Sequence, residues 1–308
     1  MYKRQGIDTL DQLAEVKAII TTVTRPDGWL VLNGDDPRVL AMHRGARARP
    51  WVFSLDPDSP ALREALDAGG RGATVLDGDI VLVRTSADPD AVVAVTDVPL
   101  TLAGLSWHNV ANVLAATAAA CALGLPRSAV VQGLRSFQPD PAHNPGRMNL
   151  YTVRGITVVV DLAHNEASLA ALLHVARGVR APGAAVRTVV GSAGDRLDEV
   201  HRAMGEIAAR GSDAVVIAAK ERYLRGRPLD ELVALWREGA AAVGVTDVVT
   251  HPSELSAVQA LVAVSGPGDV VAVMCQAERV EVDGWLRTQG ATVDGPDVVR
   301  AKVLAARP

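Results

Sequence analysis

The stretch HNPGRMNLYTVRGITVVVDLAHN, residues 143–165, decides how the chain is organised. Its first part, together with prolines at 139 and 141, breaks any helix and predicts a stiff, turning connection between two domains. Two β-rich runs on either side of Arg154-Gly155 predict a hairpin, and a helical pattern begins a few residues after Asp161. The stretch therefore predicts a domain boundary followed by a strand-to-helix junction.

Polar side chains gather at that junction. Asp161, His164 and Asn165 lie where a buried strand ends and a helix begins, and in open α/β sheets ligands bind at this carboxyl edge. Arg147, just upstream, would add a cation beside the connection. Capping of the helix by Asp161 or Asn165 is the alternative interpretation. The residues alone leave both interpretations open.

Strands and helices alternate regularly after this junction. Strands are expected at 156–160, 187–190, 214–218, 247–250 and 270–274, with helices at 197–210, 229–241 and 254–263 between later ones. This order predicts a doubly wound, Rossmann-like, mostly parallel sheet. The glycine turn at 191–194 could hold an anion, although the third glycine of a dinucleotide fingerprint is missing.

The first part of the chain predicts a separate α/β domain. Residues 1–5 fit nothing that follows and are interpreted as a scar, so structure is expected from Gly6. Thr9 and Gln12 predict a capping box for a helix whose apolar stripe ends at Lys17. Strands are expected at 29–32, 51–55, 73–76, 80–84 and 92–95.

An Ala-rich helix ending at Gly124 carries two asparagines in its first turn. Asn109 and Asn112 are three residues apart, which places them on one side of the helix. Amide side chains offer a donor and an acceptor, as the edge of an adenine requires. N-capping by Ser106 or Asn109 explains the same residues equally well.

Composition excludes several classes of protein. The 308 residues are 49% hydrophobic and 21% charged, with a net charge of −4, which is typical of a soluble protein of two domains. This charge gives no reason to expect nucleic acid or a membrane as partner. Cys121 and Cys275 lie in apolar runs without metal-ligand spacing, which indicates reduced core residues and a cytoplasmic location.

Seven short motifs, in order along the chain, resemble those of the Mur ligase family. These ATP-dependent ligases join a carboxylate to an amino acid, and the chain is most similar to the Mur-like module of cyanophycin synthetases and related stand-alone ligases. The motifs are GIDTL (6–10) with Lys17, LNGDDP (32–37), HNVAN (108–112), PGRMN (145–149), DLAHN (161–165), GDR (194–196) and LRGR (224–227). The resemblance implies that residues 6–146 are the C-terminal part of a central ATP-binding domain and residues 147–303 the C-terminal domain.

The resemblance also implies which residues bind the nucleotide. Asn109 and Asn112 would contact the adenine of ATP, Arg147 would reach the phosphates, and Asp161 would hold the ribose or position the nucleotide. His164 and Asn165 would lie near the phosphates and the acceptor amine. Arg147, Asp161, His164 and Asn165 are therefore the expected catalytic group.

Two further implications concern metal and acceptor. Lys17 would be carbamylated and would hold a magnesium ion, provided that burial favours its neutral amine. A lysine whose head reaches water is the alternative. Asp195 and Arg196 would contact the acceptor.

The chemistry implied is phosphoryl transfer from ATP to a small-molecule or peptide carboxylate, followed by attack of an amino acid on the acyl phosphate. The family's Gly-rich phosphate loop belongs upstream of Gly6, so this chain is expected to be inactive alone. Leu162 stands where the family often has tyrosine and Glu166 where it often has proline, which indicates a divergent subgroup. The alternatives are a folylpolyglutamate synthase-like glutamate ligase and a non-catalytic nucleotide-binding remnant.

Overall fold

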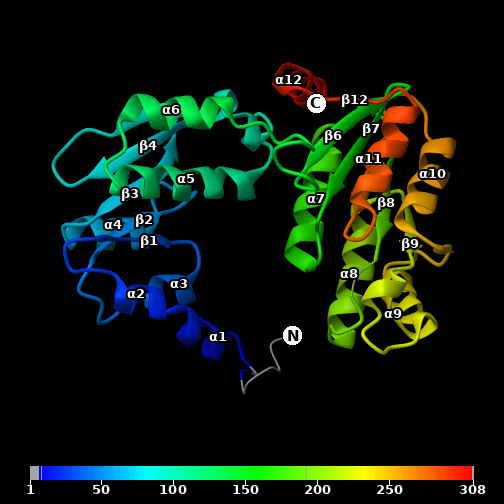
Figure 1. Ribbon diagram of the computed structural model, residues 1–308, viewed down its shortest axis with the longest axis horizontal. Helices are drawn as coiled ribbons and strands as arrows, with labels where there is room; N and C mark the ends of the chain where they lie inside the picture. Colours follow the sequence, from blue (N-terminus) through cyan, green and yellow to red (C-terminus); the bar gives the residue numbers. More distant parts are fainter. Residues whose placement is uncertain (1–6, 8, 192, 307–308) are drawn as a thin grey trace. The chain divides into compact units, whose positions relative to one another are not determined.

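The computed structural model describes residues 7, 9–191 and 193–306. The chain divides into two compact units, Met1–Phe137 and Gln138–Pro308 (Figure 1). The expectation of a scar at residues 1–5 lies outside the described residues. The proline-rich segment that was expected to end the first domain at residue 146 is part of the second compact unit.

The described residues of the first unit form a five-stranded sheet with the order β1-β2-β3-β4-β5. β1 (Trp29–Asn33), β2 (Arg49–Phe53) and β3 (Arg71–Leu76) are parallel, while β4 (Asp79–Arg84) and β5 (Asp90–Ala94) continue as an antiparallel meander. The β3–β4 hairpin turns on Asp77 and Gly78, with φ of 52° and 85°. Positive φ at both positions is what a two-residue turn needs to match the twist of its strands.

Helices α3 (Pro37–Ala41), α4 (Pro60–Asp67), α5 (Trp107–Ala122) and α6 (Arg127–Ser136) complete the core of this unit. α5 packs its buried face, which includes Val110, Val113 and Leu114, into one cluster with Trp51 and Phe53 of the sheet. Before them, α1 (Leu10–Lys17) has the expected Thr9–Gln12 capping box, and α2 (Ile19–Val23) follows.

The second unit contains, among its described residues, a seven-stranded sheet with the order β10-β9-β8-β11-β7-β6-β12. β7 (Ile156–Asp161), β8 (Val186–Val190), β9 (Ala214–Ala218), β10 (Val249–His251) and β11 (Val270–Met274) are parallel. β6 (Asn149–Val153) pairs with β7 as the expected hairpin, and β12 (Thr292–Val293) adds to β6 antiparallel. The prediction of a doubly wound, mostly parallel sheet is confirmed.

Helices cover both faces of this sheet. Figure 1 shows α7 (Glu166–Gly178) and α8 (Asp198–Gly211) on one side, and α10 (Glu254–Val264) and α11 (Arg279–Thr288) on the other. α9 (Leu229–Ala241) packs on α8, and α12 (Pro296–Ala305) ends the unit. The sequence pattern did not predict α11, β12 or α12. No helix in the described part of the chain is long and apolar enough to cross a membrane.

Candidate functional site

Asp161 is the last residue of β7 and lies at the carboxyl edge of the parallel strands. Its side chain is buried, and Oδ2 accepts a hydrogen bond from the backbone N–H of Met148 at 3.0 Å. One residue on, the N–H of Leu162 donates to the carbonyl of Gly146 at 2.7 Å. Residues 146–148 are therefore bonded directly to the end of β7, and Met148 turns there with φ of 49°.

Asn149 organises the proline-rich segment before it. Its Oδ1 accepts from the N–H of Gly146 at 2.6 Å, and its Nδ2 donates to the carbonyls of Pro139 and Asn144 at 2.9 and 3.0 Å. Its side chain is buried, so these backbone groups replace water as its partners. This explains why residues 139–145 belong to the second unit.

Burial raises the pKa of Asp161 above its ordinary value of 3.8. The N–H of Met148, the Arg147 guanidinium, the N–H of Ala163 and His164 all oppose this effect but do not cancel it. Arg147 itself is exposed. The arrangement is a desolvated carboxylate, which can accept hydrogen bonds from ligand hydroxyls, beside an accessible cation, which can attract an anionic group.

Asn165 is the N-cap of α7. Its side chain accepts from the N–H of Ser168 at 2.9 Å, and Ser168 Oγ accepts in return from the N–H groups of Asn165 and His164. The capping alternative is thus confirmed for Asn165. It is wrong for Asp161, whose carboxylate bonds to Met148. The His164 ring lies half-buried with Nδ1 3.1 Å from the carbonyl of Leu162.

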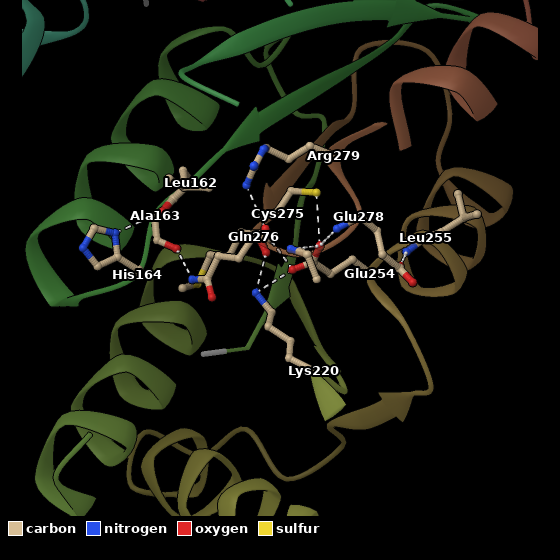
Figure 2. Close-up of polar contacts among 12 residues, drawn as sticks. Leu162, Ala163, His164, Lys220, Glu254, Leu255, Cys275, Gln276, Glu278 and Arg279 are labelled. Atoms are coloured by element: carbon tan, nitrogen blue, oxygen red, sulfur yellow. Dashed lines mark hydrogen bonds and ion pairs between the residues drawn. The ribbon is translucent and has the colours of Figure 1, made fainter. Parts of the chain in front are cut away.

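A buried ion pair lies beside this loop, and sequence reasoning missed it. Lys220, just after β9, places Nζ 2.7 Å from Oε1 of Glu254, the first residue of α10 (Figure 2). Nζ also donates to the carbonyl of Met274, the last residue of β11, at 2.9 Å. The two charged side chains are 1% and 0% exposed. Parallel strands that end at one edge bring these distant residues together.

Glu254 binds the loop that follows β11. Its carboxylate accepts from the backbone N–H groups of Gln276, Ala277 and Glu278 at 2.8 to 2.9 Å and from the thiol of Cys275 at 3.2 Å. Burial alone would raise the pKa of Glu254, but the Lys220 ammonium and these N–H groups hold it below its ordinary value. The Glu254 carboxylate is therefore ionised at neutral pH. Burial raises the pKa of the Cys275 thiol far above its ordinary value, so the thiol keeps its proton and can donate it to Glu254.

Gln276 connects the two loops of the second unit. Its Nε2 donates to the carbonyl of Ala163 at 2.7 Å, as Figure 2 shows. Its own carbonyl accepts from Nη1 of Arg279 at 2.7 Å. The loops after β7 and β11 are thus joined at the carboxyl edge of the sheet.

Asn109 and Asn112 belong to the first unit and lie in the first turns of α5. Nδ2 of Asn112 donates to Oδ1 of Asn109 at 3.2 Å, which confirms that they share one side of the helix. Asn109 is buried and Asn112 is exposed. The bond leaves Nδ2 of Asn109 as a donor and Oδ1 of Asn112 as an acceptor, the pair of groups that an adenine edge requires.

Lys17 is not buried, although carbamylation of its amine was expected to depend on burial. It is exposed, and none of the residues of α1 is buried, with Leu10 62% exposed. The expected desolvation of its amine is therefore wrong for the described structure. Among the residues that the structure describes, no group of three or more His, Cys, Asp and Glu could hold a metal ion. The described residues thus offer no all-protein metal cage, and a magnesium ion held mainly by ATP phosphates and water does not need one.

Asp195 and Arg196 lie in the loop between β8 and α8. Asp195 is exposed and Arg196 half-buried, and the carbonyl of Arg196 accepts from Nη1 of Arg227 at 3.3 Å. Arg227 also pairs with Asp198 at 3.0 Å. The two expected acceptor residues are therefore near a second arginine, which comes from the LRGR motif.

Comparison with known proteins identifies this architecture. A family model described as "Mur ligase, glutamate ligase domain" matches residues 146–276. The chain is 35% identical over 245 residues to a cyanophycin synthetase of Trichormus variabilis, covering 77% of this chain and 26% of that protein. This chain contains a Mur ligase glutamate ligase domain. The resemblance stated from its motifs is confirmed.

Other Mur ligases match over more of this chain. It is 33% identical over 271 residues to a UDP-N-acetylmuramoyl-L-alanyl-D-glutamate--2,6-diaminopimelate ligase of Thermosynechococcus vestitus, covering 86% of this chain and 49% of that one. A MurF ligase of Thermotoga maritima, solved in complex with ADP, shares the fold with a TM-score of 0.56 and 17% identity, over 96% of this chain and 59% of that one. This chain thus spans about a quarter of the cyanophycin synthetases it matches and half of the diaminopimelate ligase.

Proposed function

We propose that this chain is part of an ATP-dependent ligase that joins a small-molecule or peptide carboxylate to an amino acid through an acyl phosphate. One observation supports this more than any other: the buried Asp161 carboxylate lies at the carboxyl edge of β7, beside Arg147, within the segment that matches the family model. The edge is where an open α/β sheet binds ligands.

Each candidate residue has a task in this proposal. Asn109 and Asn112 recognise the adenine edge, and Asp161 accepts hydrogen bonds from ribose hydroxyls. Arg147, being exposed, can donate to phosphate oxygens as charge redistributes during phosphoryl transfer. ATP would supply the phosphoryl group that activates the carboxylate. His164 and Asn165 fix the shape of the loop beside it, and Asp195 and Arg196 contact the acceptor.

The setting of the reaction follows from the same chemistry. We place the ligation reaction in the cytoplasm, which contains ATP and keeps thiols reduced. Cys121 and Cys275 are both free thiols. The partners are a carboxylate and an amino acid rather than nucleic acid. A folylpolyglutamate synthase-like activity is the second candidate, but no observation favours it over the first.

ATP titration of the chain tests the proposal directly. Arg147→Ala should weaken ATP binding about tenfold or more, because a charge-assisted hydrogen bond contributes about 1.5–3 kcal/mol. Arg177→Ala is the matched control, since Arg177 is an exposed arginine at the opposite end of α7. Calorimetry on both folded variants decides the matter. Equal ATP affinity in the two would remove Arg147 from the site, and no ATP binding by the unmodified chain would favour a non-nucleotide role.

A further inference from the structure

The Lys220–Glu254 pair is a poor device for stability alone. Removing two charges from water costs free energy that their attraction barely offsets, and apolar residues of similar volume often serve as well. Both side chains are essentially inaccessible, and they lie at the ligand edge of the sheet rather than in the middle of the core. A buried pair in that position calls for a role beyond packing.

The contacts of Glu254 show what the pair accomplishes. The loop before α11 presents three successive backbone N–H groups, an arrangement that ordinarily attracts an anion. Here the anion is internal, because Glu254 fills the site and Lys220 neutralises it. Glu278 completes the arrangement by accepting from the N–H of Leu255, next to Glu254. These hydrogen bonds tie the loop to the start of α10.

The loop is bonded to the candidate nucleotide loop by the N–H of Cys275, which donates to the carbonyl of Asp161 at 2.8 Å, and by the side chain of Gln276. Gln276, whose backbone N–H is bonded to Glu254, uses its amide to hold the carbonyl of Ala163, two residues after Asp161. The Arg279 side chain lies against the other part of the site, since a Cβ added to Gly146 would meet its Cδ at 2.4 Å. The β11–α11 loop therefore supports both segments that flank Asp161.

We propose that Glu254, held by Lys220, is a positioning residue that acts through Gln276 to fix the Asp161–Asn165 loop. Neither charged group touches the ligand. The consequence for nucleotide binding rests on the function proposed above, whereas the positioning of the loop does not. A mutation at Glu254 should therefore loosen residues 162–164, which lie in the loop between β7 and α7.

Hydrogen exchange of the intact chain, without nucleotide, tests the positioning itself. Glu254→Gln and Gln276→Ala should each speed exchange of the Leu162 and His164 N–H groups about tenfold, the effect of losing one buried hydrogen bond. In the double variant, Glu254→Gln should add little, because its effect passes through Gln276. Lys302→Met is the matched control, since it disrupts a different buried network, with Thr152, Thr157 and Asp294, in the same unit.

If Glu254→Gln alone fails to fold, the double variant Lys220→Met/Glu254→Gln replaces it in the same measurement. It removes both charges at nearly constant volume and so leaves no unpaired buried charge. Unchanged exchange at Leu162 and His164 in folded Gln276→Ala would overturn the proposal. Full additivity of Glu254→Gln and Gln276→Ala would do the same. ATP titration of the same variants then separates the two claims. Faster exchange with weaker ATP binding supports both, and faster exchange with unchanged ATP binding supports positioning but removes this loop from the nucleotide site.

Discussion

At the scale of single residues, Asp161 combines two opposing demands. A carboxylate placed beside Arg147 is suited to a polar ligand, but burying it makes the charged form unfavourable in the native state. Asn165 has the opposite character, because its hydrogen bonds with Ser168 all serve the N-terminus of α7. The two residues of one motif thus differ in what they contribute to stability.

Replacing Asp161 by asparagine should stabilise the protein at neutral pH. The native-state pKa is raised, so the favourable, protonated form is fully present below the ordinary value of 3.8. That contribution is lost as the pH rises through the raised value, which leaves a cost at pH 7. Asp161→Asn retains an oxygen for the N–H of Met148 and removes the charge. Between pH 4 and pH 8, the melting temperature of the variant should exceed that of the unmodified chain by a margin that grows toward neutral pH. ATP binding by the variant should be weaker. A lower melting temperature at pH 7 would contradict this account.

Substitution of Asn165 separates capping from ligand contact. Asn165→Ala should lower the free energy of unfolding by about 1 kcal/mol, as loss of an N-cap usually does. Asn165→Asp keeps the cap and should leave stability nearly unchanged. If phosphates lie nearby, however, the added negative charge should weaken ATP binding. Denaturant titration and calorimetry on the two variants give these quantities, and identical ATP affinity in both would limit Asn165 to capping.

At the scale of elements, α8 and α9 depend on glycines where their backbones meet. A Cβ on Gly205 would lie 2.3 Å from the carbonyl oxygen of Trp236, and one on Gly239 would lie 1.9 Å from that of Arg202. Backbone atoms cannot move aside as a flexible side chain can. The two helices therefore pack at a distance that only glycine permits.

Gly239→Ala should destabilise the second unit by about 1–3 kcal/mol or more, because the added methyl forces the helices apart. Gly284→Ala is its control, since Gly284 lies in the middle of α11 with no atom within 4 Å of an added Cβ. The control should stabilise by about 0.5–1 kcal/mol through helix propensity alone. Denaturant midpoints of the two variants should move in opposite directions, and a shared direction would refute the packing argument.

Most regular helices and strands could be predicted from the sequence, because their boundaries coincide with the ends of hydrophobic patterns. β9, α9 and β11 begin and end where their hydrophobic patterns do, because each is a buried strand or an amphipathic helix between turn residues. The sequence pattern did not predict α11 and β12, because α11 has only two buried residues and β12 is two residues long. α8 was predicted within one residue of its observed ends, but nothing in the pattern indicated that His201 is fully buried.

The site was only partly predictable for a different reason. Asp161 and Asn165 follow one strand and could be read from a local pattern. Lys220, Glu254 and Gln276 follow three other elements, and only the strand order β10-β9-β8-β11-β7 brings them together. A local sequence pattern does not contain the strand order, so it could not indicate that Lys220 and Glu254 form a buried pair.

At the scale of the whole molecule, the two compact units should be separable at residue 138. The fragment 138–308 is expected to fold alone with one cooperative transition. A fragment starting at Met148 should be less stable by about 2–3 kcal/mol, because buried Asn149 loses the carbonyls of Pro139 and Asn144, each worth about 1 kcal/mol. Thermal unfolding of the two fragments gives the difference, and equal stability would show that the proline-rich segment contributes nothing to this unit.

The outermost strands of the two sheets imply different behaviour at high concentration. In the second unit these strands are β10, of three residues, and β12, of two, so few backbone groups are open to a neighbouring molecule. In the first unit, β5 is guarded by Arg127, which bonds the carbonyl of Ala91, but β1 has five residues and an apolar sequence. Aggregation on storage should therefore begin by strand addition at β1, and shielding or charging that strand is the first step toward a soluble, crystallisable preparation.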